Sequence, residues 1–221
     1  VTHDGAIYLD GLLAWVAWQR MPREERDALP HPNLTDAPHD FALPLARWTS
    51  PAPEGCAPSL LDADGRAWGW CASVAQAKWV AEETRHVRRK VEIGAMARWT
   101  PGGKLNTAGG TPIKHWDLPY AARLASELVW WCVGDPDAVR ELLRDVGHVG
   151  KVHNHGNGEV LAWLVEECDE DRSVTYDGHA MRSVPTTIGA LQGHSEIAAI
   201  RAPYWHRSRR VECWAPRGDV T

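Results

Sequence analysis

Residues 135–166 read DPDAVRELLRDVGHVGKVHNHGNGEVLAWLVE, and this stretch carries most of the information about the fold. Asp135 is a favourable helix N-cap, and Pro136 suits the first helical position because its missing N–H would have no partner there. Apolar residues then recur at helical spacing as far as Gly147, a typical helix stop. The stretch therefore predicts a helix that begins at Asp135 and ends before Gly147.

A loop dense in glycine follows this helix. Its glycines are Gly147, Gly150, Gly156 and Gly158, and the polar residues between them are Lys151, His153, Asn154 and His155. Glycine allows a backbone to approach a bound group closely, and successive N–H groups bind phosphate oxygens. We interpret the loop as an RNA-binding site; the alternative is an ordinary connection that needs positive φ at several positions. The alternating residues 160–165 predict a strand after it.

The remaining chain predicts further strands and helices in alternation. These are a strand at 6–9, a helix from Asp10 to before Pro22, a strand at 67–74 with Trp68 and Trp70 on one face, a strand-like stretch at 91–99, a helix at 119–126 and strands at 128–133 and 211–214. Residues 22–64 show little periodicity and predict a long irregular insertion. Without the insertions, the order is βαββαβ, which is typical of a ferredoxin-like α+β fold.

We therefore expect a ferredoxin-like core over residues 1–168. An arm, residues 76–117, would be inserted between its second and third strands. Residues 169–221 would form a less regular C-terminal extension or a degenerate second lobe.

Composition limits the classes of function. A net charge of −5 counts against a freestanding nucleic-acid-binding protein but allows a subunit that touches a few nucleotides inside an assembly. The five cysteines are scattered without a CxxC pair, and no basic leader precedes an apolar segment, so we expect reduced thiols in a prokaryotic cytoplasm. No apolar run reaches membrane-spanning length, and we expect no membrane association.

The arm has two basic segments. Residues 85–90, RHVRRK, predict either a nucleic-acid contact or an ordinary solvated helix surface. Residues 101–119 form a loop rich in glycine and cations, which could also be a plain surface hairpin with tight turns. Trp99 and Trp116 flank this loop and could stack on bases.

Taken together, several segments resemble the CRISPR-associated RAMP superfamily. The glycines of the loop at 147–158 match the signature that follows its second helix. Four further segments resemble the type IV subgroup: YLDGLLAW (8–15), LNTAGGTPIK (105–114), MRSVP (181–185) and RAPYW (201–205). Within that subgroup, the chain looks like the effector-complex subunit that caps the 5′ handle of the guide RNA (crRNA).

The resemblance implies a non-catalytic RNA-binding subunit with no cofactor and no metal. The core would hold the first nucleotides of the crRNA, and the arm would be a thumb that presses on the RNA and the adjoining subunit. The RNA contacts implied for the arm are Arg98, Lys104, Asn106, Lys114 and His115. The expected partners are the crRNA 5′ handle, the backbone filament, a large-subunit-like protein and, through guide pairing, target DNA.

Two other functions stay open at this stage. A RAMP-type ribonuclease could cleave crRNA without metal by using a histidine as general acid or base, and the candidates are His86, His115, His153 and His155. His153 and His155 could also bind a metal ion together, but no third ligand lies at a sequence spacing typical of metal sites. The second alternative is an adaptor that contacts protein alone.

Overall fold

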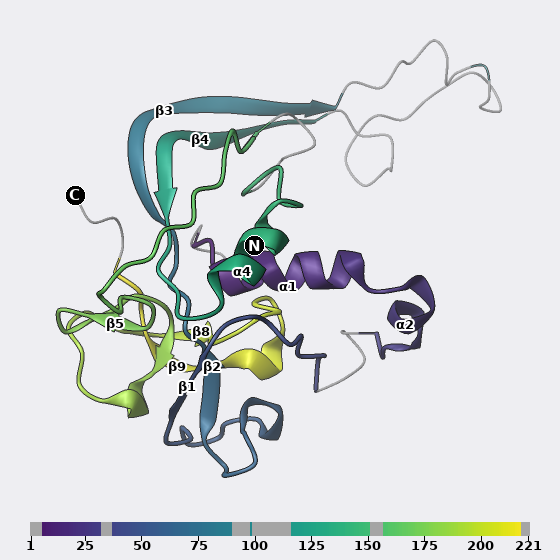
Figure 1. Ribbon diagram of the computed structural model, residues 1–221. Helices are drawn as coiled ribbons and strands as arrows, with labels where there is room; N and C mark the ends of the chain where they lie inside the picture. The colour runs from purple at the N-terminus through teal and green to yellow at the C-terminus, as the bar shows by residue number, and fades with distance from the viewer. Residues whose placement is uncertain (1–5, 32–36, 90–97, 99–115, 151–156, 218–221) are drawn as a thin grey trace. The chain divides into compact units, whose positions relative to one another are not determined.

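The computed structural model describes residues 6–31, 37–89, 98, 116–150 and 157–217 (Figure 1). The chain divides into two compact units, one made of residues 1–76 and 128–221 and the other of residues 77–127. Short helices and small antiparallel sheets build the protein, which confirms the predicted α+β class. Among the described residues, no helix is long and apolar enough to cross a membrane.

Most of the secondary structure belongs to the larger unit. Its helices are α1 (Leu9–Arg20), α2 (Arg23–Ala28) and α4 (Pro136–Leu143), with short 3-10 turns η2 (Pro58–Leu60), η5 (Thr186–Ile188) and η6 (Arg207–Arg209). Its strands are β1 (Arg47–Ser50), β2 (Ala67–Trp70), β5 (Thr175–Tyr176), β6 (His179–Ala180), β7 (Val184–Pro185), β8 (Ser195–Ala199) and β9 (Arg210–Trp214). The smaller unit is a hairpin of β3 (Gln76–Arg89) and β4 (Trp116–Val129).

The strands pair in separate small sheets. β1 pairs with β2, β3 with β4 and β5 with β6, while β9 lies between β7 and β8 in a three-stranded sheet. The described residues therefore do not contain the single four-stranded sheet of a ferredoxin-like core, and that finer prediction is not confirmed. The predicted terminal strand is confirmed, because residues 211–214 lie in β9.

The ribbon of β1 and β2 lies between two hydrophobic clusters. One cluster contains Trp68 and Trp70 together with the buried faces of α1 and α4. The other contains Trp48 and Ala67 together with residues of the three-stranded sheet. Because side chains alternate along a strand, the two faces of one short ribbon serve both clusters. The predicted placement of Trp68 and Trp70 on one face is confirmed by their direct ring contact, with centroids 5.4 Å apart.

The start of the chain differs from its prediction. In place of a strand, Tyr8 makes a single antiparallel bridge with Val74, and α1 begins at Leu9. Asp10 is not the N-cap but a fully buried residue in the first helical turn. It cannot serve as a cap because its carboxylate binds Arg182 and Tyr204. The insertion at 22–64 is also more regular than expected, since it contains α2, β1 and η2.

The predicted helix at 119–126 is wrong, because these residues belong to β4. Ala121, Ala122 and Leu124 favour a helix, but pairing with β3 outweighs this weak preference. The basic residues that precede Lys90 also lie on a strand, β3, and not on a helix. Of the predicted strand at 128–133, residues 128–129 lie in β4, and Cys132 makes an isolated bridge. The strand-like stretch at 91–99 falls outside the described residues, except for Arg98.

The helix that opens the 135–166 stretch is confirmed as α4, whereas the strand predicted at its end is wrong. Residues 160–165 have no regular secondary structure, and Glu159 makes an isolated bridge with His148. Val160, Trp163 and Val165 pack against the first cluster, so apolar packing produced the alternating pattern without a paired strand.

Candidate nucleic-acid interface

Helix α4 fixes the position at which the glycine loop begins. Asp135 caps it, since its carboxylate accepts hydrogen bonds from the N–H groups of Asp137 at 2.9 Å and Ala138 at 3.1 Å. Val139 and Leu143 are buried, and α4 packs against α1 in the larger unit (Figure 1). The loop thus starts from an element held at its N-terminal end and along one face.

The base of the loop is closed by backbone hydrogen bonds. The Val149 N–H donates to the Gly158 carbonyl at 2.8 Å, and the Val160 N–H donates to the Gly147 carbonyl at 2.9 Å. The Val149 side chain is buried in the first cluster. Together these contacts hold residues 147–150 and 157–160 side by side. Lys151, His153, Asn154, His155 and Gly156 lie outside the described residues, and their role stays a prediction.

The glycines of the loop base serve different purposes. Gly158 has a φ of +72°, and a Cβ added there would lie 1.9 Å from the Val149 carbonyl oxygen. Only glycine therefore permits this closure, which agrees with the interpretation of Gly158 as part of a plain connection. Gly150 has a φ of +97° and Gly147 an ordinary one, and a Cβ at either position would meet no atom of the described residues within 4 Å. Close packing therefore does not explain these two glycines within the described part of the chain.

The β3–β4 hairpin of the smaller unit is exposed along nearly its whole described length. Most of its described basic side chains are neutralised locally. His86 and Arg88 both contact the Asp117 carboxylate, at 2.6 and 2.9 Å, and Arg123 contacts Glu82 at 2.9 Å. The hydrogen bond from His86, followed by the Arg88 charge, lowers the pKa of Asp117. The RHVRRK segment is thus not a free cationic patch in its described part.

Most of the RNA contacts predicted for the arm lie outside the described residues. Arg98 is exposed. Lys104, Asn106, Lys114 and His115 lie outside the described residues. Of the histidines considered for a ribonuclease, His86 is described and is engaged with Asp117. No group of three or more His, Cys, Asp or Glu side chains in the described ranges is placed to hold a metal ion.

The segments 8–15, 181–185 and 201–205, which carried the family resemblance, meet in the interior. Arg182 donates to the Ala72 and Ile200 carbonyls at 2.8 and 2.7 Å, to the Trp70 carbonyl and to Asp10 at 3.4 Å. The Tyr204 hydroxyl donates to both Asp10 carboxylate oxygens, at 2.6 and 2.7 Å, and also accepts a hydrogen bond from Arg182.

Tyr8 completes this buried network. Its ring stacks on that of Tyr204 with centroids 4.0 Å apart, and its hydroxyl lies 2.6 Å from the Ser183 hydroxyl. Burial raises the pKa of Tyr8 to about 12. Burial alone would lower the pKa of Arg182, but the Asp10 charge and the two tyrosines outweigh it and raise that pKa. Most of the network is buried, with Tyr204 half-buried at its edge, and it links segments that are far apart in the sequence.

A second buried network links residues 38–60 to the C-terminal part. Arg201 binds Asp40 through two hydrogen bonds of 3.0 Å and lies 3.9 Å above the Trp68 ring. Arg209 donates to the same Asp40 at 2.6 Å and to the Pro38 carbonyl at 2.7 Å. Burial, together with the charge of Arg201, lowers the pKa of Arg209 to about 10. Arg209 is thus a buried structural residue, although it lies in a short run of arginines at 207–210 that looks like ordinary surface.

A family model described as CRISPR type IV associated protein Csf3 matches residues 1–216. No curated protein matches the chain. The family match spans both units and every segment on which the resemblance was based. It confirms the predicted relationship to type IV CRISPR-associated proteins.

Proposed function

Because the chain belongs to the Csf3 family of CRISPR type IV associated proteins, we propose that it binds the 5′ handle of the crRNA. Family membership makes it a component of a type IV CRISPR complex. Within that complex it would cap one end of the backbone filament, without chemistry of its own. A large-subunit-like protein would be a further neighbour, and target DNA would be reached through guide pairing in the cytoplasm.

The observation that carries the proposal is the closed base of the glycine loop. Val149 and Gly158 pair across the base, and the capped helix α4 leads into it. The paired base fixes the two points at which the 151–156 segment joins the described chain, so these points need no further ordering when a ligand binds. Lys151, His153, Asn154, His155 and Gly156 would then meet phosphate oxygens, which position an RNA without reading its sequence.

The exposed hairpin supports the role of the arm as a thumb. A two-stranded hairpin is marginally stable by itself in water. Strand alternation along β4 places Leu118, Tyr120 and Leu124 on one face, and both leucines are exposed. This apolar row would lie against the adjoining backbone subunit, while Arg98 and the cations of the 99–115 segment would contact RNA.

The RAMP-type core over residues 1–168, with residues 169–221 as its extension, remains part of the proposal. The buried Arg182 network joins residues from both parts, so the two would fold together. Capture of RNA by such a scaffold requires no catalytic group, which distinguishes it from the ribonuclease alternative.

The experiment measures binding and cleavage of a labelled repeat-derived RNA by the full chain, with EDTA, across a salt series. We expect intact RNA in a salt-sensitive complex that Lys151→Glu weakens. Arg23→Glu is the matched control, because Arg23 is exposed and its carboxylate partner is Asp27 in the same helix. Cleavage that survives EDTA would support the ribonuclease, and a Lys151→Glu variant that binds like the control would contradict the proposal.

A further inference from the structure

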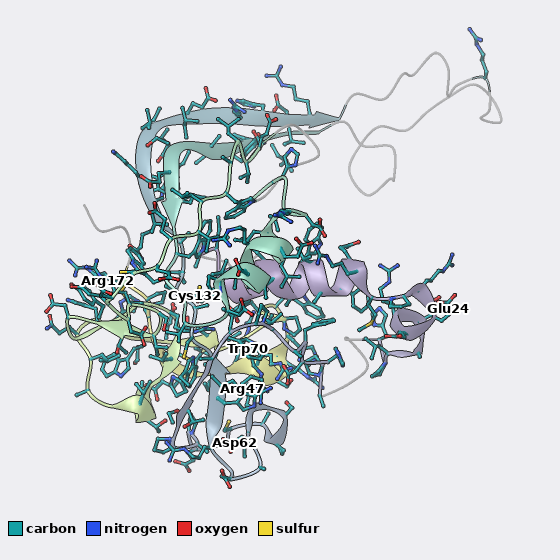
Figure 2. All side chains as sticks on the ribbon, viewed as in Figure 1. Glu24, Arg47, Asp62, Trp70, Cys132 and Arg172 are labelled. Atoms are coloured by element: carbon teal, nitrogen blue, oxygen red, sulfur yellow. The ribbon has the colours of Figure 1, made fainter. Side chains whose placement is uncertain are left out.

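Arg47 on β1 is held in place by two tryptophans of β2. Its guanidinium carbon lies 4.1 Å from the centroid of the Trp68 ring and 4.9 Å from that of the Trp70 ring. The two rings are perpendicular to each other, and both are buried. Figure 2 labels Arg47 and Trp70, which lie next to each other on this ribbon. Stacking on two fixed rings restricts the guanidinium before any ligand arrives.

The Arg47 guanidinium nevertheless has no polar partner among the described residues, although it is exposed. Most other described arginines have a carboxylate within ion-pair distance. These are Arg20, Arg23, Arg85, Arg88, Arg123, Arg140, Arg144, Arg172, Arg182, Arg201 and Arg209. Arg47 thus combines a fixed position with hydrogen-bond donors that remain available to a ligand.

A second arginine, Arg66, has no carboxylate within ion-pair distance among the described residues and contacts the same face of the ribbon. In the antiparallel register Arg47 is opposite Trp70 and Thr49 is opposite Trp68, so these four side chains share one face. Arg66 donates to the Thr49 hydroxyl at 3.2 Å. Residues two apart on a strand are separated by about 7 Å. The nearby Asp62 carboxylate accepts from the backbone N–H groups of Asp64 and Arg66 and forms no ion pair with the Arg66 guanidinium.

We propose that this arginine face, made of Arg47, Thr49 and Arg66, binds the sugar–phosphate backbone of a single-stranded nucleic acid. It would be a second contact besides the glycine loop, and it rests on the proposed role in RNA binding. The planar guanidinium matches two oxygens of one phosphate, and a hydroxyl between two cations can donate to the next. The chain is acidic overall, so a polyanion is expected to approach where cations lack internal partners.

Spacing favours a strand of nucleic acid over a single carboxylate. Arg47 lies two residues, about 7 Å, from Thr49 on β1, and Arg66 contacts the Thr49 hydroxyl from the other side. Cations placed one after the other along an extended ribbon suit a ligand with repeating negative charges. Trp68 and Trp70 are buried, so this face offers phosphate contacts and no free ring for base stacking. We therefore expect RNA and DNA of one sequence to bind this face similarly.

The test compares the full chain with the Arg47→Gln/Arg66→Gln double variant by fluorescence anisotropy, using labelled repeat-derived RNA and the same sequence as single-stranded DNA. Each lost phosphate contact should reduce the slope of log K against log salt by about 0.7, so the double variant should lose about 1.4. Arg23→Gln/Arg144→Gln removes two exposed charges that are already ion-paired and should keep the wild-type slope. Thermal unfolding checks that all variants fold.

The outcomes separate this proposal from the proposed function. If the salt slope of the Arg47→Gln/Arg66→Gln variant is unchanged, the arginine face is overturned. The loop contact still stands in that case if Lys151→Glu weakens RNA binding. A reduced slope with no effect of Lys151→Glu supports the arginine face and contradicts the loop contact. If the wild-type chain binds neither the RNA nor the DNA at low salt, the arginine face is overturned. Displacement of RNA by polyglutamate at equal charge also overturns it, because the partner would then be an acidic peptide.

Discussion

Replacing Asp10 with asparagine tests whether one buried ion pair holds the start of the chain to its C-terminal part. Both side chains of the Asp10–Arg182 pair are fully buried. The substitution removes the charge that balances Arg182 and one acceptor of the Tyr204 hydroxyl. Breaking a buried pair by removing one partner costs about 3–5 kcal/mol. Since domains are stable by about 5–15 kcal/mol, we expect the variant to be marginally folded.

Urea denaturation followed by tryptophan fluorescence measures this effect. With an m-value of about 2 kcal/mol per molar urea, the midpoint should fall by about 1.5–2.5 M. Asp27→Asn is the control, because its pair with Arg23 is exposed and should contribute less than about 1 kcal/mol. The Asp10→Leu/Arg182→Met double variant should recover only part of the loss. It leaves no unpaired buried charge, but the Trp70, Ala72 and Ile200 carbonyls lose their donor. An Asp10→Asn midpoint equal to that of the control would show that the buried Asp10–Arg182 pair contributes no more than an exposed one.

Three further predictions concern other parts of the larger unit. Gly158→Ala places a Cβ 1.9 Å from the Val149 carbonyl oxygen at positive φ, so the free energy of unfolding should fall by about 2 kcal/mol or more. Hydrogen exchange of the Val149 N–H should become faster, and an unchanged exchange rate would contradict this prediction. Asp135→Ala removes the cap of α4 and should cost about 1 kcal/mol in the free energy of unfolding, whereas a neutral effect would show that the cap is dispensable. Burial raises the pKa of Cys213 from 9.0 to about 12, so its stabilising contribution is complete below pH 9 and is lost as the pH rises towards 12. The melting temperature should therefore fall less between pH 9 and 11 in Cys213→Ser than in the wild type. Equal falls would show that ionisation of the Cys213 thiol does not cause the loss of stability.

Local signals predicted α4 correctly because its stop and start are determined by neighbouring residues. Asp135, Pro136 and Gly147 act within a few positions of the helix ends, and the cap forms as expected. The same kind of reasoning failed for residues 119–126, where helix-favouring alanines form β4. Propensity differences of a few tenths of a kcal/mol per residue are outweighed by pairing along a long hairpin.

Long-range pairs could not be predicted from spacing. Asp10 and Arg182 are 172 positions apart, and Asp10 also looked like a helix cap because acidic residues favour that position. Segments 8–15, 181–185 and 201–205, on which the resemblance was based, lie within the range matched by the family. Their Tyr8, Arg182 and Tyr204 side chains support the fold. Arg47 carried no sequence signal, since its role depends on Trp68 and Trp70 across the ribbon.

The most direct test of the proposed function is crosslinking of a crRNA that carries 4-thiouridine in its 5′ handle to the full chain, in EDTA. We expect an intact RNA and crosslinked peptides that contain residues 150–158, and we expect Lys151→Glu, but not Arg23→Glu, to reduce the crosslinks. Handle crosslinks confined to other segments, or RNA cut in EDTA by the wild type and not by His153→Ala, would contradict it.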